Sequence, residues 1–271
     1  MASFECDQAE GLRRMLAGPK PRIFTFLSAA PVADKSAMLV NLSASLALSG
    51  SDVVLLDACT SADGITRRMG VDMQATLLDV ARQQRALDQV VQAMPQGFGL
   101  ASLTSGSLHA ATHDADQLRR LSNAFGVLAA QSDVLVVDAE LDANDNFAIP
   151  GMASGDIVIQ VTPGAASIKQ AYSLIKRLNA QLGRRPFGIL VTGADEREAE
   201  VVYQNMAQAA SRYLAVQLHA VGSVPSDDHL TRAARLGRAV VDAFPMAGAS
   251  VAFRRLAERF ALSAHGARLG A

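Results

Sequence analysis

Cysteine, tryptophan and net charge are all scarce in this 271-residue chain. It has two cysteines, no tryptophan, and 25 Lys and Arg against 26 Asp and Glu, for a formal net charge of -1. The cysteines, Cys6 and Cys59, lie far apart in the sequence, which argues against a disulfide framework or a cysteine metal site. The near-neutral charge gives no reason to expect direct binding to nucleic acid.

A long hydrophobic run is also missing. No stretch approaches the roughly 18 consecutive apolar residues of a membrane span. The N-terminus lacks the basic-then-apolar order of a secretion signal. We therefore expect a cytoplasmic protein, with weak peripheral attachment at the inner face of the plasma membrane as the alternative. Half of the residues are hydrophobic and 19% are charged, which allows a sizeable core.

Short apolar runs alternate with helical patterns along most of the chain. The runs span residues 22–28, 52–58, 98–103, 133–139, 156–162, 186–192 and 218–225. Helical patterns span residues 36–48, 76–91, 114–131, 168–182, 200–214 and 250–264. Apolar strands that are each separated by a helix predict an α/β fold, with a mostly parallel sheet covered on both faces.

The N-terminus carries a short helical pattern of its own. Asp7 and Glu10 have the spacing of a capping box, Leu12 and Leu16 make a narrow apolar stripe, and the sequence GPKP at 18–21 stops the pattern. A helix this short is not stable alone. We therefore expect it to dock, either on a partner protein or on the rest of the chain.

The stretch that follows the first predicted strand has the strand–loop–helix order of a phosphate-binding loop, yet its loop has no glycine. Lys35 and Ser36 stand where a lysine reaches the phosphates and a hydroxyl holds magnesium. Glycines normally let the backbone approach the phosphates closely. Here Pro31 removes an N–H donor, and Asp34 sets a carboxylate beside the phosphate oxygens.

Two acids mark the neighbouring strand ends. Asp57 and Asp138 each close an apolar run, and the carboxyl ends of parallel strands are where α/β sheets build their sites. Asp138 stands where a Walker B aspartate would, although a helix cap or a loop acid is the plainer interpretation. If nucleotide binds, Ser36, Asp57 and Asp138 are the candidate magnesium ligands.

Four stretches resemble the MinD/ParA-like P-loop ATPases with the deviant Walker A loop, and within them the FlhG (FleN, YlxH) regulators of flagellar number and position. They are residues 7–15 (DQAEGLRRM), 40–58, 162–178 (TPGAASIKQAYSLIKRL) and 212–235. The first is similar to the DQAxxLR activator helix of FlhG and is the most specific of the four. The resemblance implies a P-loop NTPase fold of the MinD type.

The resemblance also implies domains and partners. Residues 1–21 correspond to the activator helix and linker, and residues 22–271 to the MinD-like domain. The family's partners are the FlhF GTPase, a FleQ-type transcription activator and flagellar switch-complex proteins. The matching residues for contact with FlhF are Asp7, Gln8, Ala9, Leu12 and Arg13.

The chain departs from the family at the loop that carries the chemistry. The family reads SGKGGVGKT, and over residues 28–36 only Ser28, Lys35 and Ser36 are kept. The family's signature lysine, which reaches the partner subunit's ATP, falls on Ala30. Its second acid after the second strand falls on Cys59. DAELD replaces the family's DTGAG at residues 138–142.

The nucleotide-binding candidates that remain form a reduced set. They are Lys35, Ser36, Asp57 and Asp138, with Asp227 bordering the adenine pocket of the family. Thr192 stands where the family tends to place an asparagine that reads adenine. The cofactor we expect is ATP or ADP with magnesium, weakly bound.

Two interpretations follow. In the first, the fold and the partner surfaces are kept and hydrolysis is lost, which makes the chain a pseudo-ATPase. In the second, it is an active MinD-like ATPase that cycles between a cytosolic monomer and a membrane-bound ATP dimer. Phosphoryl transfer depends on positioning and charge stabilisation, so losing the glycine cradle, the cross-dimer cation and a catalytic acid together favours the first.

The last predicted helix leaves two placements open. Phe253, Leu256, Ala257 and Phe260 share one face. This face can cover the sheet, or it can lie on a membrane as the family's targeting helix does. The apolar face is short, so we expect it in the core.

Overall fold

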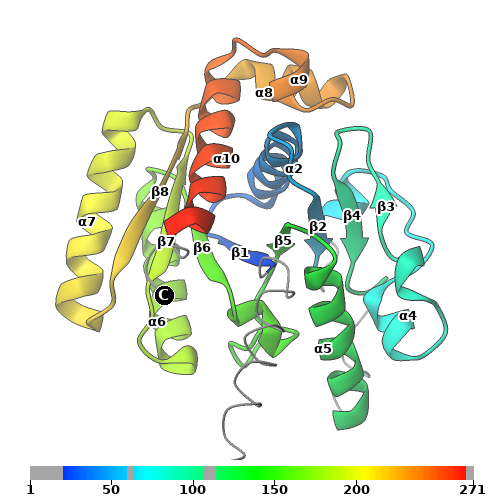
Figure 1. The fold of residues 1–271 in the computed structure, drawn as a ribbon. Helices are drawn as coiled ribbons and strands as arrows, with labels where there is room; N and C mark the ends of the chain where they lie inside the picture. Colours follow the sequence, from blue (N-terminus) through cyan, green and yellow to red (C-terminus); the bar gives the residue numbers. More distant parts are fainter. Residues whose placement is uncertain (1–20, 60–63, 106–113, 267–271) are drawn as a thin grey trace, which may run out of the picture.

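The structure is a computed structural model that describes residues 21–59, 64–105 and 114–266. Within these ranges the strands form one eight-stranded sheet in the order β3-β4-β2-β5-β1-β6-β7-β8 (Figure 1). Neighbouring strands are parallel except for the antiparallel pair of β3 and β4. The strands are β1 (Arg22–Ser28), β2 (Val53–Asp57), β3 (Gln92–Ala93), β4 (Gly99–Ser102), β5 (Val134–Asp138), β6 (Asp156–Val161), β7 (Phe187–Thr192) and β8 (Leu218–Val224).

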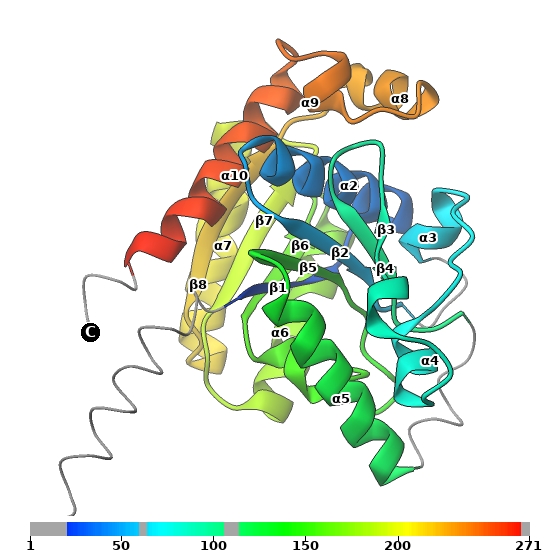
Figure 2. The same cartoon turned by 45° about the vertical axis from the view of Figure 1, so that its right-hand side comes forward.

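Helices cover both faces of the sheet (Figures 1 and 2). They are α2 (Val32–Leu48), α3 (Ile65–Arg68), α4 (Leu77–Ala81), α5 (Ala115–Ala130), α6 (Ala165–Leu182), α7 (Glu196–Leu214), α8 (Asp228–Arg235), α9 (Val240–Ala243) and α10 (Gly248–Gly266), with 3-10 turns at Leu87–Gln89 and Pro150–Ala153. One core lies under α4, α5, α6 and α7, and the other lies under α2, α9 and α10. Strands β2, β5 and β7 are buried along their whole length, as their continuous apolar sequences require. The predicted α/β fold with a mostly parallel sheet is confirmed.

Helix α10 settles into the core. The side chains of Phe253, Leu256 and Phe260 are buried, and the Phe260 ring meets the Phe24 ring of β1 edge-on at 4.4 Å between centroids. The core placement expected from the sequence is therefore confirmed for the described part of this helix. In the ranges that the structure describes, no helix has the combined length and apolar character needed to cross a bilayer.

The helix predicted over residues 76–91 is wrong in length. Thr76 and Asp79 form a reciprocal capping box, and α4 then ends at Ala81. Gln83 takes a positive φ of 61°, which breaks the helix, and residues 82–86 are exposed. A helix here would bury no further apolar face, so the periodicity does not decide the structure.

The start of α2 and the first edge of the sheet also differ from the prediction. The sequence pattern placed the helix start near Ser36, whereas α2 starts at Val32. The short strand β3, which pairs antiparallel with β4, was not predicted. The N-terminal helix predicted over residues 7–16 lies outside the described residues, so the division between residues 1–21 and 22–271 stays a prediction.

Candidate functional site

The strand register brings the predicted acids together. Asp57 at the end of β2 pairs with Asp138 at the end of β5, and Asp138 in turn pairs with Phe26 of β1. The loop that leads from β1 into α2 therefore faces both carboxylates. Asp57 and Asp138 are 3% and 1% exposed, so whatever binds them determines the chemistry of this edge of the sheet.

The connection from β1 to α2 is too short to form a wrapping loop. Only residues 29–31 lie between the two elements. The N–H of Ala29 donates to Gln160 O at 2.9 Å, and the N–H of Ala30 donates to Ser28 Oγ at 3.0 Å. Pro31, which has no N–H, precedes the first helical residue, and the N–H groups of Asp34 and Lys35 donate to Pro31 O. Residues that would line a phosphate cradle thus form the first turn of α2.

Lys35 is directed at the end of β5. Its ammonium donates to Ala139 O at 2.6 Å and forms an ion pair with Asp138, and Lys35 is only 7% exposed. Burial raises the pKa of Asp138 above its ordinary value, while the Lys35 ammonium acts in the opposite direction. Two protein acceptors therefore hold the one lysine that the motif offers to a phosphate.

Asp57 is also engaged, as a cap for α3. Its Oδ2 accepts from the N–H and the hydroxyl of Thr66 at 2.9 and 2.6 Å, and its Oδ1 accepts from Cys59 N at 3.2 Å. Gly64, which precedes α3, has no side chain to cap the helix itself, and a Cβ at Gly64 would lie 2.5 Å from Asp57 Oδ2. The carboxylate stabilises the N-terminus of α3 in place of a local cap.

Cys59 completes a compact buried group. One ligand atom from each of Asp57, Cys59 and Asp138 lies within 4.8 Å of the others. The Cys59 Sγ is 3.7 Å from Asp138 O, and burial raises the pKa of the thiol well above its ordinary value. A neutral thiol is a poor magnesium ligand.

These residues do not fit a bound magnesium ion in the arrangement that the structure holds. The carboxylates and the hydroxyl of Ser36 have the chemistry that Mg²⁺ prefers. However, both oxygens of Asp57 accept hydrogen bonds from protein donors, and Asp138 pairs with Lys35.

Asp227 has a different role from its neighbours in the predicted set. It caps α8 by accepting from His229 N, and it accepts from Ala249 N of α10, both at 2.9 Å. Burial opposes its ionisation, but these two hydrogen bonds and the His229 ring outweigh that effect and lower the pKa of Asp227. The structure thus brings together Lys35, Asp57 and Asp138, with Ser36 buried next to Lys35 in α2, whereas Asp227 fastens α8 to α10.

Two residues that the sequence analysis missed hold the site in place. Gln160 is fully buried in β6, where its amide donates to Thr192 Oγ1 at 3.0 Å and its Oε1 accepts from Ser28. A glutamine inside the apolar run DIVIQVT was a signal for such a role. Thr66 had no comparable signal, because its contact with Asp57 depends on how the chain returns after β2.

The fold and this group of residues define the class of protein. It is an α/β protein of the P-loop ATPase plan, in which a lysine after the first strand faces aspartates at the ends of two neighbouring strands. No family model matches the chain. The antiactivator FleN of Pseudomonas aeruginosa is 31% identical over 226 residues, which cover 83% of this chain and 81% of that protein. The chain belongs to the FleN family.

Other relatives agree with the class. An uncharacterized ATP-binding protein of Methanocaldococcus jannaschii is 23% identical over 83% of this chain and 82% of its own length. Among solved structures, the cell division ATPase MinD of Pyrococcus furiosus has a TM-score of 0.67 at 19% identity and covers 89% of this chain and 98% of its own. A ParA family ATPase of Chlorobium tepidum has a TM-score of 0.66 at 18% identity and covers 88% of this chain and 99% of its own. These structural similarities establish the fold.

The predicted contact residues for a partner, Asp7, Gln8, Ala9, Leu12 and Arg13, lie outside the described residues. Their role stays a prediction, as does nucleotide binding at Lys35 and Ser36.

Proposed function

We propose that this chain is a regulator of flagellar number and placement of the FlhG/FleN type, which acts by binding other proteins and does not turn over ATP. Membership of the FleN family supports the regulatory part of this proposal. The name antiactivator, which the relative carries, supports a FleQ-type transcription activator as one partner. Flagellar switch-complex proteins and the FlhF GTPase are the others.

The observation that carries the proposal is how the phosphate-loop lysine is used. Lys35 pairs with Asp138 and Ala139 O, while the residues before it form the first turn of α2. Binding a triphosphate requires that this turn unwinds and that a buried ion pair separates. Both steps cost free energy that a glycine loop does not pay. This supports a site that binds ATP or ADP weakly and does not hydrolyse it.

The second candidate is an active MinD-like ATPase that cycles between a cytosolic monomer and a membrane-bound dimer. MinD of Pyrococcus horikoshii in complex with Mg-ADP shares the fold, with a TM-score of 0.64 at 20% identity. This likeness favours nucleotide binding among proteins with this fold. The second candidate is disfavoured by Ala30, which stands at the position of the cross-dimer lysine. Loss of the dimer would also leave membrane attachment weak, in accord with the buried apolar face of α10.

The test is stimulation of the FlhF GTPase from the same organism by the purified chain, with and without ATP. The natural chain is expected to stimulate equally in both conditions, because its N-terminal activator segment, residues 7–16 and called the arm below, acts without a nucleotide switch. Gln8→Ala and Arg13→Ala are expected to lose the stimulation. Gln170→Ala, which changes an exposed glutamine on α6, is the matched control.

Two outcomes contradict the proposal. Full stimulation by both arm variants removes the role of the arm. If the natural chain neither stimulates FlhF nor binds a FleQ-type activator, the regulatory function itself is wrong.

A further inference from the structure

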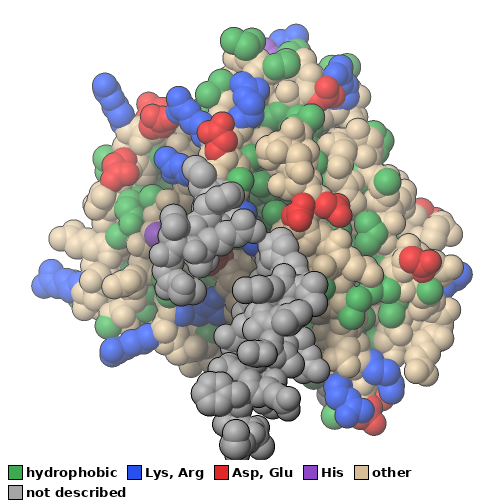
Figure 3. Space-filling view, viewed as in Figure 1, with side chains coloured by type: hydrophobic (Ala, Val, Ile, Leu, Met, Phe, Trp, Pro, Cys, Tyr) green, Lys and Arg blue, Asp and Glu red, His purple; other side chains and the backbone are tan. Residues whose placement is uncertain are grey.

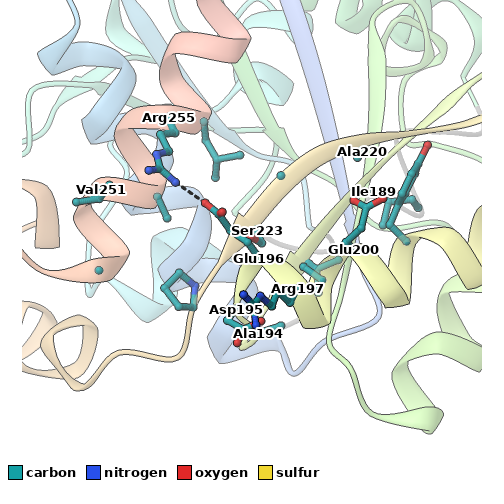
Figure 4. A pocket seen from close by; sticks show the side chains of 18 of the residues that line it. Ile189, Ala194, Asp195, Glu196, Arg197, Glu200, Ala220, Ser223, Val251 and Arg255 are labelled. Carbon is teal, nitrogen blue, oxygen red and sulfur yellow. Dashed lines mark hydrogen bonds and ion pairs between the residues drawn. The ribbon is translucent and has the colours of Figure 1, made fainter.

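A groove of about 740 Å³ runs along the outer edge of the sheet, between α7 and α10 (Figure 4). Its floor is the edge strand β8 and small side chains, among them Ala199, Ala220 and Ala252. Charged side chains form its rim. Figure 4 shows Glu196 of α7 and Arg255 of α10 reaching toward each other across it, and the two form an ion pair.

The edge strand itself is protected against pairing with another strand. The hydroxyl of Tyr203 donates to Leu218 O at 3.0 Å, and the guanidinium of Arg259 donates to Val221 O at 3.0 Å. The register of β8 also shifts between Ile189 and Leu190 of its neighbour β7. These are devices that natural sheets use against edge-to-edge pairing. An occupant of the groove therefore packs on its side chains, as a helix does, and does not extend the sheet.

The groove leads to the place where the N-terminal segment joins the domain. A second hollow of about 340 Å³ is lined by Phe24, Asp156 and His219, and it shares Ala220 and Arg259 with the first. Phe24 is the third residue of β1, which starts at Arg22. The two hollows together connect the start of β1 with the end of the groove near Val251.

We propose that residues 7–16 of the chain's own N-terminal segment occupy this groove, so that the arm is stored on its own domain when no partner is bound. The length of the segment allows this. Ten helical residues span about 15 Å, and the four residues 17–20 span about 13 Å when extended. The seven-residue strand β8 is about 23 Å long. Strand β8 lies three strand spacings from β1, about 14 Å across the sheet, so residues 17–20 are nearly fully extended in crossing it. The helix then covers about two-thirds of the length of β8.

The rim of the groove carries side chains of both charges, so the acids and the arginines of the segment can each meet an opposite charge there. A segment that enters from the start of β1 has its later residues, Arg13 and Arg14, near that strand, and Asp7 and Glu10 toward Val251. The rim near Val251 carries Arg197 and Arg255 together with Asp195 and Glu196. Toward the start of β1 it carries Asp156 and Glu200 together with Arg259. Leu12 and Leu16 then pack on the small side chains of the floor. This buries the apolar stripe of a helix that is too short to be stable alone in water.

The surface ion pair across the groove does not oppose this docking. Glu196 and Arg255 are 77% and 62% exposed, and pairs as exposed as this contribute little to stability. A docked acid exchanges one carboxylate partner of Arg255 for another. This step rests on the proposed function, in which the same arm binds FlhF. The groove and the GTPase then compete for the arm, and docking in the groove lowers the fraction of chains whose arm is free to bind FlhF.

Disulfide trapping tests the docking, because Cys6 directly precedes the segment and is expected to lie near Val251 when the segment is docked. In a Cys59→Ala background, the variants Val251→Cys and Ser223→Cys each place one thiol in the part of the groove where Cys6 is expected. Mild oxidation is expected to form a disulfide within one chain in either variant. Val127→Cys, on the exposed face of α5, is the matched control and is expected to remain reduced. Arg255→Glu added to Val251→Cys is expected to lower the trapped fraction severalfold, since it sets a carboxylate against Asp7 and Glu10.

The outcomes separate cleanly. Trapping of both groove variants no faster than Val127→Cys overturns the proposal. A disulfide that joins two chains also overturns it, because the groove would then hold the segment of a second copy. The experiment uses neither FlhF nor ATP, so its failure leaves the proposed function standing, and failure of the GTPase test leaves the docking standing.

Discussion

At the scale of single residues, the pair of Lys35 and Asp138 decides how this site behaves. Both side chains are more than nine-tenths buried, and the ammonium also donates to Ala139 O. A buried ion pair gains little over an apolar pair of the same size, but removing one partner leaves an uncompensated charge. The lysine therefore contributes to the stability of the fold, a role that an open phosphate loop does not require of it.

Lys35→Met is expected to lower the free energy of unfolding by about 3–5 kcal/mol, because Asp138 then stays buried without its counter-ion. The double variant Lys35→Met with Asp138→Leu is expected to recover most of this loss. Urea denaturation followed by circular dichroism measures both. If the single variant is as stable as the natural chain, Lys35 is not held by Asp138 in solution.

The contacts of Asp227 predict a pH dependence. Its pKa is lowered in the folded chain by hydrogen bonds from Ala249 and His229, against the effect of burial. The folded state thus binds this proton less readily than the unfolded state, whose pKa is about 3.9. The stabilisation is present above that unfolded value and is lost as the pH falls through the lower folded pKa.

Asp227→Asn is therefore expected to destabilise the chain at pH 7, and this difference is expected to shrink toward zero as the pH falls below about 4. Thermal unfolding of the two proteins across this range measures it. Asp228→Asn, one residue further along, changes an exposed carboxylate and serves as the control. A difference that stays constant down to pH 2 would mean that the cap does not depend on ionised Asp227.

At the scale of elements, the start of α2 separates this chain from the loop pattern it resembles. Pro31 fixes a backbone that enters a helix, and Ala33 and Asp34 continue it where the pattern has valine and glycine. The sequence predicted that the cradle is lost. It did not predict that the helix extends over those positions, because the alignment to a loop suggested a loop.

Replacing residues 29–34, AAPVAD, by GKGGVG tests this view of α2. The graft restores four glycines and the signature lysine, and each glycine placed in the former helical turn is expected to cost about 0.5–1 kcal/mol of stability. Calorimetry with Mg-ATP is expected to show a gain of at least about 1.4 kcal/mol in binding free energy, which is tenfold in Kd. The same graft with Lys35→Ala is the control. No gain from the graft would mean that the neighbouring residues, and not the loop, limit binding.

Other elements show which sequence signals were sufficient. Helix α5 was predicted within a residue at each end, because Asp114 caps it and its apolar face repeats regularly. The pattern at residues 76–91 failed because residues 82–86 have no surface to pack against. The hairpin of β3 and β4 rests on two paired residues, Gln92 and Ala93, which carry no alternation.

At the scale of the whole molecule, the parallel order of the strands explains why the site could be predicted in part. Strand ends that share one edge of a sheet bring their acids together, so the sequence alone placed Asp57 near Asp138. The partners that occupy those acids, Lys35 and Thr66, come from segments whose paths depend on the whole fold. One view of the surface has side chains of both charges scattered over it (Figure 3), in accord with a formal net charge of -1.

Association of whole molecules provides the last prediction. In the family that the chain resembles, a lysine at the position of Ala30 reaches the partner subunit's ATP, and a glycine-containing stretch follows the acid at Asp138. Here that lysine is absent and the stretch is DAELD, in which Asp142 Oδ1 instead accepts from the backbone of Asn144 and Asn146. An ATP-bound pair would lack its cross-subunit cation and would face additional carboxylates. Sedimentation velocity is therefore expected to give the same mass with Mg-ATP and without it, whereas the loop graft, run alongside, restores the cation. If Mg-ATP doubles the mass of the natural chain, the cycling ATPase is the correct function and the buried lysine pair is only its resting state.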